Sequence, residues 1–542
     1  MKLLKAAALA AACLSAGPAA AQSAAAPPRL IVVISIDQFS GDIFAEYRQH
    51  FTGGLQRLSE GVVFPSGYQS HAATETCPGH STILTGSRPA RTGIIANAWF
   101  NLGVAREDKE VYCSEDPRVP GSSSDDYTVS TYHLKVPALG DLMKRRNPAS
   151  RVAVVAGKDR SAIMMGGYGP DQRFWWSGKN FTGDTKAPIQ AFAAANQAVA
   201  QALTQPRPPL EMPPACEVRS RAVAVTGEPG SVGTGRFARE IGDSRAFRAS
   251  PELDGSTLAL AAAARAEMKL GEGETTDLLI VGLSATDYVG HSYGTEGSEM
   301  CLQLHSLDRD LGDFFARLDA TGVDYLVALT SDHGGHDLPE RHRDHAAPTA
   351  DRVKAELSPS EMSKAIAARL GLAGTVFHGN GPFGDMYIDR ALPAAQRARV
   401  LTEAVRAYRA HPQVAAVFTQ AELRAAPNPS GPPDEWSLIE RARASFDPER
   451  SGDLVVLLKP RVTPIGKPGR GYVATHGSPW NYDRRVPILF WRKGMRGFEQ
   501  PLAVETVDIL PTLAALIGLP IAPGSIDGRC LDLAEGPETT CR

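Results

Sequence analysis

The sequence predicts an α/β fold: a three-layer α/β/α sandwich around a central, mainly parallel sheet, with inserted cap regions. Short runs rich in Val, Ile and Leu recur without polar alternation, as in strands buried on both faces. Longer segments of helical periodicity lie between them, and strands that alternate with helices form parallel sheets covered on both sides. The strand-like runs are residues 30–36, 151–155, 277–283, 325–330, 454–458 and 487–491, and the clearest helical segments are 256–270, 301–318, 394–410 and 505–517.

Composition limits the class of protein. The chain has 542 residues with 57 Lys+Arg against 60 Asp+Glu, so it lacks the basic excess of a dedicated nucleic-acid binder. Hydrophobic residues make up 43% of the chain, which supplies a core and excludes disorder as the main state. We therefore expect a globular protein with neither a nucleic-acid polymer nor an anionic membrane as its main partner.

The first 21 residues have the pattern of a bacterial secretory signal peptide. A short basic start precedes a mostly apolar run over residues 6–16, and Ala19 to Ala21 form a small-residue cleavage pattern. Cys13 offers a weaker lipoprotein alternative, because the motif around it is out of register by one place. Cleavage leaves residues 22–542 and removes two lysines, so the net charge changes from −3 to −5. We expect a periplasmic or secreted protein, and no later run of about 18 apolar residues predicts a membrane span.

Six cysteines remain after cleavage, an even set that suits disulfides in an oxidising compartment. Their pairing is not fixed by the sequence alone. Closeness along the chain favours Cys77 with Cys113 and Cys530 with Cys541, which leaves Cys216 with Cys301.

Two proline-rich segments, residues 205–214 and 426–433, interrupt the alternation of strands and helices. Such segments form surface connections or the edges of insertions. We expect one catalytic domain over residues 22–542 with insertions at about 98–150, 180–250 and 340–450.

Polar residues follow four of the buried strands. In open parallel sheets, ligands bind beyond the carboxyl ends of the strands. A single Asp after a strand usually caps a helix or a turn, but several at one edge of a sheet indicate a site. The residues are Asp37 after 30–36, Lys158 after 151–155, Asp287 after 277–283, and Asp332 with His333 after 325–330.

The types and spacing of these residues predict a metal centre. Asp287 and His291 stand at i and i+4, so one helical turn brings both side chains to the same face. Asp332 and His333 precede two glycines, which allow the backbone to turn sharply. His476 is a weaker candidate. Carboxylate oxygen together with imidazole nitrogen suits zinc rather than calcium.

Thr76 is the candidate nucleophile. Pro78 suits the first position of a helix, which puts Thr76 at the helix N-terminus, where backbone N–H groups favour an anion. Alone, Thr76 would be interpreted as a helix cap. Beside metal ligands, its hydroxyl can be activated for attack.

Together these motifs resemble the alkaline phosphatase superfamily, and within it the single-chain bacterial alkaline phosphatases of flavobacteria and sphingomonads, which are related to the nucleotide pyrophosphatase/phosphodiesterases. The resemblance spans nearly all of the mature chain, in the family's order. It is carried by residues 34–37, 76–80, 85–89, 93–97, 157–160, 284–291, 331–336, His476 and 506–511.

The resemblance implies a secreted monoesterase with two zinc ions that acts on small phosphate monoesters and releases inorganic phosphate. A covalent phosphothreonine would form on Thr76, and activity would rise with pH. It also implies a monomer. One zinc would be held by Asp287, His291 and His476, and the other by Asp37, Asp332, His333 and the Thr76 oxygen.

The resemblance places Asn97, Lys158 and Arg160 on the substrate phosphate, as catalytic and substrate-binding residues. A monoester dianion needs more positive charge than a diester, and Arg supplies a planar fork where Lys supplies a point charge. Lys158 and Arg160 leave their strand at alternate positions, so both can point to one side. Because Lys158 stands where dimeric phosphatases keep a magnesium ion, we expect no third catalytic metal.

Two other functions remain open. A phosphodiesterase or nucleotide pyrophosphatase has the same ligands and nucleophile, but the pair Lys158 and Arg160 favours the monoesterase. A periplasmic protein that binds zinc or phosphate without turnover is disfavoured by Thr76. Residues 342–345 contain two histidines, and their polar surroundings favour a solvated loop over a metal site.

Overall fold

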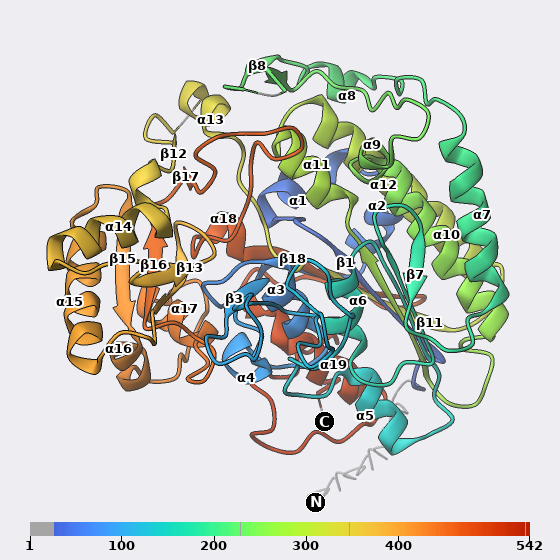
Figure 1. Cartoon of the computed structure of the whole chain (residues 1–542). Helices are drawn as coiled ribbons and strands as arrows, with labels where there is room; N and C mark the ends of the chain where they lie inside the picture. The colour runs from blue at the N-terminus through green and yellow to red at the C-terminus, as the bar shows by residue number, and fades with distance from the viewer. Residues whose placement is uncertain (1–25, 228, 346, 537, 542) are drawn as a thin grey trace, which may run out of the picture.

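The computed structural model describes residues 26–542 apart from 228, 346, 537 and 542, so the expected signal peptide and Cys13 lie outside the described residues. A ten-stranded sheet forms the centre, in the order β19-β2-β18-β11-β1-β10-β5-β6-β7, with β20 paired to β2 (Figure 1). Five neighbouring strands are parallel, which confirms the predicted α/β fold with a mainly parallel sheet. They are β11 (Tyr325–Thr330), β1 (Leu30–Ile36), β10 (Asp277–Leu283), β5 (Val152–Ala156) and β6 (Gln172–Trp176).

Strand β1 shows why these runs are apolar throughout. Every one of its residues is buried, because alternate side chains enter two different cores. Leu30, Val32 and Ile34 pack into a core with α1 (Gly41–Tyr47), α10 (Pro251–Met268) and α12 (Ser298–Asp319). Ile31 and Val33 pack into the opposite core with α3 (Thr76–Ile83), α5 (Leu139–Arg146) and α19 (Ile509–Leu516). The sheet is therefore covered on both faces.

The sheet becomes antiparallel toward both edges. Strand β18 (Arg485–Arg492) runs against β11 and against β2 (Val62–Tyr68), and β7 (Phe181–Gly183) runs against β6. Two short strands, β19 (Phe498–Glu499) and β20 (Val504–Glu505), pair in parallel with β2 at this edge. No strand was predicted at β2, because Pro65 interrupts its apolar run. In the structure the register with β18 shifts between Val486 and Ile488.

A second sheet stands apart from the first. It is antiparallel, in the order β13-β14-β16-β15, and it forms the left-hand lobe in Figure 1 with helices α14 to α16. The run 454–458, expected in the central sheet, is strand β16 here; an apolar run predicts a strand but not its partners. The bounds are β13 (Phe377–Gly379), β14 (Gly384–Ile388), β15 (Val414–Thr419), β16 (Leu454–Leu458), α14 (Pro359–Leu370), α15 (Ala394–Ala410) and α16 (Gln420–Ala425).

The remaining elements are short or peripheral, apart from α7 and α11. The segment predicted as one helix over 505–517 consists of a 3₁₀ turn, η3 (Thr506–Asp508), and α19. The other helices are α2 (Gly54–Ser59), α4 (Pro89–Thr92), α6 (Asp159–Gly166), α7 (Gln190–Leu203), α8 (Pro214–Glu217), α9 (Ser244–Arg248), α11 (Ala285–Tyr293), α13 (Pro339–His345), α17 (Leu438–Ser445) and α18 (Asn481–Arg484), with 3₁₀ turns η1 (Arg48–His50) and η2 (Ala355–Leu357). Paired short strands are β3 (Ala98–Phe100) with β4 (Glu110–Tyr112), β8 (Val223–Ala224) with β9 (Ser231–Val232), and β12 (Asp351–Arg352) with β17 (Val462–Thr463).

Three disulfides join the predicted partners: Cys77 to Cys113, Cys216 to Cys301, and Cys530 to Cys541. Such a set is typical of a protein that folds outside the cytoplasm. None of the helices that the structure describes combines the length and the apolar character that crossing a membrane requires.

Candidate active site

The parallel strands deliver the predicted polar residues to one edge of the central sheet. Asp37 directly follows β1, and Asp332 stands two residues beyond β11. Lys158 is the N-cap of helix α6 after β5, and Asp287 lies in the first turn of α11 after β10. Each of these four side chains is at most 2% exposed. The structure therefore brings together buried charges that are far apart in sequence.

Asp37, Asp332 and His333 form a first group of possible metal ligands. Each offers one ligand atom, and the three atoms lie within 4.8 Å of one another. Thr76 is next to this group, with its Oγ1 3.5 Å from His333 Nε2. These are the four residues that the sequence assigned to one metal ion.

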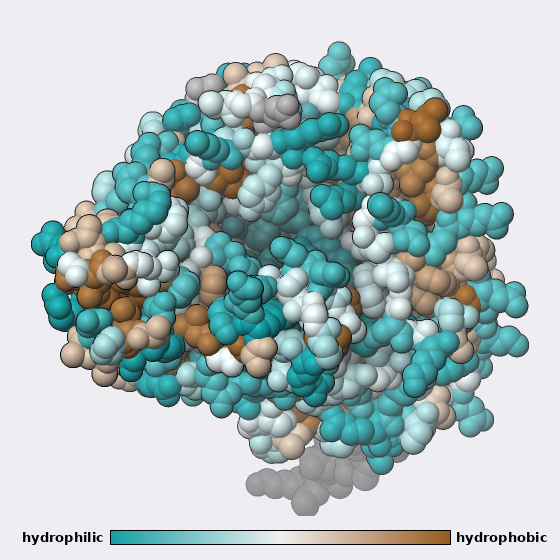
Figure 2. Space-filling view, in the orientation of Figure 1, coloured by the Kyte–Doolittle hydropathy of each residue, from teal (hydrophilic) through white to brown (hydrophobic). Residues whose placement is uncertain are grey.

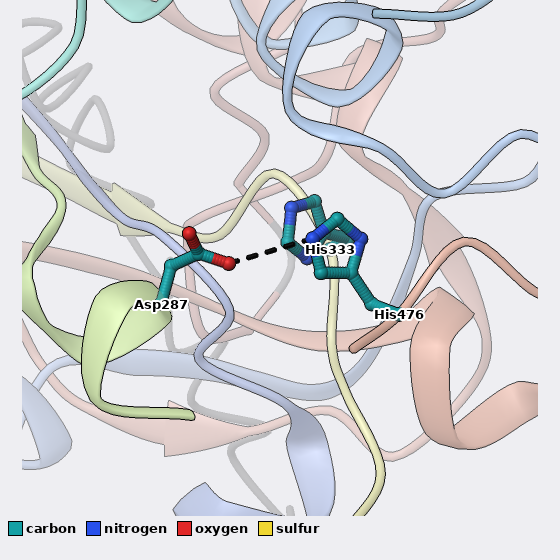
Figure 3. Close-up of side chains that lie close together, drawn as sticks. All are labelled: Asp287, His333 and His476. Carbon is teal, nitrogen blue, oxygen red and sulfur yellow. Dashed lines mark ion pairs between the residues drawn. The ribbon is translucent and has the colours of Figure 1, made fainter. Parts of the chain in front are cut away.

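A second group surrounds Asp287. Asp287, His333 and His476 also offer ligand atoms within 4.8 Å of one another, and Figure 3 shows the carboxylate facing the two imidazoles. The rings of His333 and His476 stack with centroids 3.6 Å apart. Asp287 Oδ1 lies 3.4 Å from His476 Nε2 and 3.2 Å from His291 Nε2. The structure thus collects the second predicted set and adds His333, which lies at both groups.

The chemistry of these donors fits divalent transition metals. Asp37 Oδ1, Asp287 Oδ1 and Asp332 Oδ2 are buried with no recorded hydrogen bond among the described residues, and their nearest recorded partners are imidazole nitrogens 3.1–3.5 Å away. A divalent cation between these oxygens and imidazoles would satisfy both kinds of ligand. Burial raises the pKa of Asp37 well above its ordinary value, and the charges of Asp287 and Asp332 raise it further. Burial lowers the pKa of His333 to about 3, so its imidazole is neutral, the form that binds metals. Mixed oxygen and nitrogen donors suit zinc.

Lys158 lies between the two groups. Its Nζ is 2.6 Å from Asp37 Oδ2 and 2.5 Å from Asp287 Oδ2. Burial would lower the pKa of Lys158, but the charges of Asp287 and Asp37 raise it above its ordinary value, so the side chain stays protonated. Lys158 and Arg160 do not extend a strand as predicted, because helix α6 begins directly after Lys158. Arg160 instead points its Nη1 at the Tyr112 hydroxyl, 3.2 Å away, and its Nε is buried without an acceptor.

Thr76 is the first residue of helix α3, and Pro78 is the third rather than the first. The N-terminal position predicted for Thr76 is therefore found, although one feature used to predict it lies deeper in the helix. Helix α3 packs directly against the loop after β11. Gly79 permits this approach, because a Cβ there would lie 1.9 Å from the Asp332 carbonyl oxygen.

Sequence reasoning missed two residues beside Thr76. Glu75 Oε2 accepts a hydrogen bond from the Asn97 backbone N–H at 2.7 Å, and Asn97 Oδ1 accepts one from the Cys77 N–H at 2.8 Å. These two hydrogen bonds fix the Asn97 backbone and Oδ1, so its side-chain NH₂ group can reach the site. His80 Nδ1 lies 3.1 Å from Asp332 Oδ2. The only sequence signal for Glu75 and His80 was their spacing from Thr76: Glu75 directly precedes it, and His80 follows it by one helical turn.

A cavity of about 430 Å³ reaches this cluster. Figure 2 shows a hollow with a hydrophilic floor beside the left-hand lobe. The predicted residues in the cavity wall are Thr76, Asn97, Arg160, His291 and His476, whereas Asp37, Lys158, Asp287, Asp332 and His333 do not form that wall. A molecule entering the cavity would therefore meet the candidate nucleophile Thr76, the Arg160 guanidinium, His291 and His476 first.

The segment predicted as a solvated loop over 342–345 belongs to helix α13. His342 Nε2 lies 3.3 Å from Glu296 Oε1, and these two residues form a third acidic group with Asp337. Arg341 Nη1 lies 2.7 Å from Asp337 Oδ1, so a guanidinium already neutralises that carboxylate. The group therefore does not call for a metal ion.

A mainly parallel sheet with two groups of candidate carboxylate and imidazole ligands beside a threonine at a helix N-terminus is the arrangement expected of a phosphate-ester hydrolase of the alkaline phosphatase superfamily. The sequence profile described as Type I phosphodiesterase / nucleotide pyrophosphatase matches residues 31–479, and the chain belongs to this family.

Two relatives with high sequence identity carry alkaline phosphatase names. Alkaline phosphatase PhoK of a Sphingomonas species is 61% identical over 518 residues, covering 95% of this chain and 92% of PhoK. Alkaline phosphatase PhoD of Zymomonas mobilis is 51% identical over 518 residues, covering 95% of this chain and 89% of PhoD. The crystal structure of alkaline phosphatase PafA superposes with a TM-score of 0.80 at 24% identity, covering 93% of this chain and 98% of PafA, and supports the fold.

Proposed function

We propose that the protein is a zinc-dependent alkaline phosphatase that hydrolyses small phosphate monoesters through a covalent phosphothreonine on Thr76. The observation that carries this proposal is the position of Thr76 Oγ1, 3.5 Å from His333 Nε2, where the two groups of possible ligands meet. The names of the relatives that are 61% and 51% identical support it.

The residues of the chain divide the chemistry between them. Asp287, His291 and His476 would hold one zinc ion, and Asp37, Asp332 and His333 the other, with Thr76 at their junction. When bound, zinc would make the hydroxyl and water more acidic and take up charge on the leaving oxygen. Thr76 Oγ, having given its proton to solvent, attacks phosphorus; the bond between phosphorus and the alcohol oxygen breaks, and that oxygen leaves with the bonding electrons and takes a proton from solvent. Water then cleaves the phosphothreonine, releases phosphate and returns a proton to Thr76.

Three side chains would stabilise the charge of the non-bridging oxygens, and two of them, Asn97 and Arg160, line the cavity. Arg160 offers a buried Nε with no acceptor among the described residues, and the Asn97 side-chain amide is oriented by the Cys77 N–H, while the Asn97 backbone N–H is held by Glu75. Lys158 adds a fixed positive charge behind the nucleophile, where a third, magnesium ion would otherwise be needed. This concentration of positive charge favours a monoester dianion over a diester monoanion.

The second candidate function is that of a phosphodiesterase, which the family description favours. The deciding experiment compares an aryl monophosphate with the matching bis-aryl diester, using enzyme stripped by a chelator and reloaded with zinc. We expect the monoester to have the much higher kcat/KM, and activity to be lost with chelation and regained with zinc. Equal or faster diester cleavage would overturn the monoesterase assignment.

We further propose that the mature enzyme is a periplasmic or secreted monomer comprising residues 22–542. The three disulfides support maturation outside the cytoplasm. Mass measurement of the exported protein would find an N-terminus at Gln22, and size-exclusion chromatography with light scattering would give the mass of one chain.

A further inference from the structure

The cavity has a second part with a different character from the phosphate end. Its wall there combines aromatic rings with two carboxylates, and Arg160 is the only Lys or Arg among the described residues that line the cavity. The rings belong to Phe100, Phe383, Tyr387 and Tyr472, and the carboxylates to Glu75 and Asp385.

This part adjoins His291 and His476, which belong to the proposed zinc site on the side away from Asp37 and Asp332. The Tyr472 ring lies 5.0 Å from that of His291, centroid to centroid. A Cβ on Gly477, directly after His476, would lie 2.9 Å from Phe383 Cζ and 3.8 Å from Glu75 Cγ. Phe383 and Glu75 therefore meet at the residue next to His476, where the alcohol portion of a phosphate monoester would project.

The second carboxylate comes from the antiparallel lobe. Asp385 lies on β14, and its Oδ1 accepts a hydrogen bond from the Gly452 N–H at 2.6 Å. Neither Asp385 nor Glu75 takes part in an ion pair recorded among the described residues. Burial, and to a smaller extent the nearby charge of Glu75, raises the pKa of Asp385 to about 7. Above that pH Asp385 adds a negative charge to a wall whose one Lys or Arg among the described residues, Arg160, is assigned to the substrate phosphate.

Carboxylates beside aromatic faces form the usual recognition site for ammonium groups, because the ring faces and the carboxylates both attract a cation. We propose that this part of the cavity binds the alcohol portion of phosphate monoesters that carry an ammonium group, as choline and ethanolamine esters do. The proposal rests on the proposed monoesterase function and assigns its substrate class. Asp385 would be a specificity-determining residue, contributed by a different sheet from the nucleophile.

A pair of isosteric substrates tests the proposal. Phosphocholine and 3,3-dimethylbutyl phosphate have nearly the same shape and differ in a positive nitrogen against a neutral carbon. The kcat/KM ratio of the two esters is measured at pH 9, where Asp385 is ionised, for the zinc-loaded enzyme and for Asp385→Asn. The substituted side chain keeps an oxygen to accept the Gly452 N–H. We expect the ratio to fall about tenfold in Asp385→Asn.

The comparison of ratios removes the difference in leaving-group acidity, because that difference is the same for both enzymes. Asp389→Asn is the matched control: Asp389 follows the same strand but does not line the cavity, and it keeps an acceptor for the Ala391 N–H. Its ratio should equal that of the parent enzyme. A ratio unchanged in Asp385→Asn, or lowered equally in Asp389→Asn, would overturn the proposal. If the parent enzyme hydrolysed neither ester, that result would instead contradict the proposed monoesterase function.

Discussion

Lys158 Nζ lies 2.5 Å from Asp287 Oδ2, so an ammonium group and a carboxylate expected to bind metal form a buried ion pair. The same ammonium contacts Asp37, which belongs to the other group of possible ligands. One lysine thus connects both halves of the candidate centre. A buried carboxylate that loses its charged partner destabilises the protein. The ion pairs of Lys158 therefore couple the carboxylates proposed to bind metal to the positive charge proposed to act on the substrate.

Replacing either cation should change the preference between monoesters and diesters. We expect Lys158→Ala and Arg160→Ala each to lower kcat/KM for an aryl monophosphate by about 10²- to 10³-fold, the typical loss for one donor that stabilises transition-state charge. The loss on a diester, which carries less charge, should be much smaller. Lys354→Ala, at an exposed lysine paired to Asp351, is the control and should leave both rates unchanged. An unaltered ratio of the two rates would refute these roles.

Thr76 should be needed for turnover but not for metal binding. Because three of the four proposed ligands of its group remain, Thr76→Ala should keep two zinc ions per chain by atomic absorption while losing hydrolysis. Thr76→Ser restores a hydroxyl on the same helix position and should recover part of the rate. A Thr76→Ala enzyme with the parent's rate would exclude a phosphothreonine.

Asp254 should make stability depend on pH. It is 1% exposed, and burial raises its pKa to about 7, with Oδ1 accepting the Ala285 N–H and Oδ2 accepting from Gln303. The folded state therefore holds this proton more tightly than the unfolded state. The free energy of unfolding should fall as pH rises from about 4 to about 7, by up to ~4 kcal/mol for this one group.

Asp254→Asn should abolish that part of the pH dependence. Its oxygen can still accept from Ala285, and Gln303 can turn its Oε1, which has no recorded partner, toward the new amide. We expect urea denaturation to give a more stable variant than the parent at pH 8 and a much smaller difference at pH 4. Parallel pH profiles for the two proteins would contradict the assignment.

The disulfide Cys77 to Cys113 should matter for substrate binding as well as stability. It joins the residue after Thr76 to a residue whose N–H bonds the Asn97 carbonyl at 2.9 Å. Replacing both cysteines with Ser should lower stability by ~4 kcal/mol and raise KM, because Asn97 is held less firmly. The terminal pair Cys530 and Cys541 closes a shorter loop, and replacing it should cost ~3 kcal/mol without changing KM. A KM increase of the same size in both variants would show that the effect is not local.

The sequence predicted those features that local pattern determines. Strands buried on both faces are continuous apolar runs, so β1, β10 and β11 were predicted with the bounds that the structure has. Polar residues directly after such strands must meet at one edge of a parallel sheet, which predicted the cluster around Asp37 and Asp287. Closeness along the chain was enough to predict the disulfides.

Features that depend on distant partners could not be predicted. Strand β16 has the same composition as a central strand, and only its pairing with β14 and β15 assigns it to the second sheet. Nothing in the local sequence of Asp385 indicates a cavity that also contains Glu75, 310 positions earlier in the printed sequence. Lys158 and Arg160 were expected to leave their strand at alternate positions and point to one side, but helix α6 begins directly after Lys158, and the Lys158 side chain lies between two carboxylates.

The cavity wall is built by two sheets with separate hydrophobic cores. Thr76 and the candidate metal ligands lie on helices and loops at the edge of the central sheet, whereas Phe383 and Asp385 come from the antiparallel lobe. Mutations in the lobe can therefore alter which alcohols are accepted without disturbing bond cleavage. Evolution could therefore change the range of substrates of such an enzyme through substitutions in the antiparallel lobe, while the residues proposed to cleave the phosphate ester stay the same.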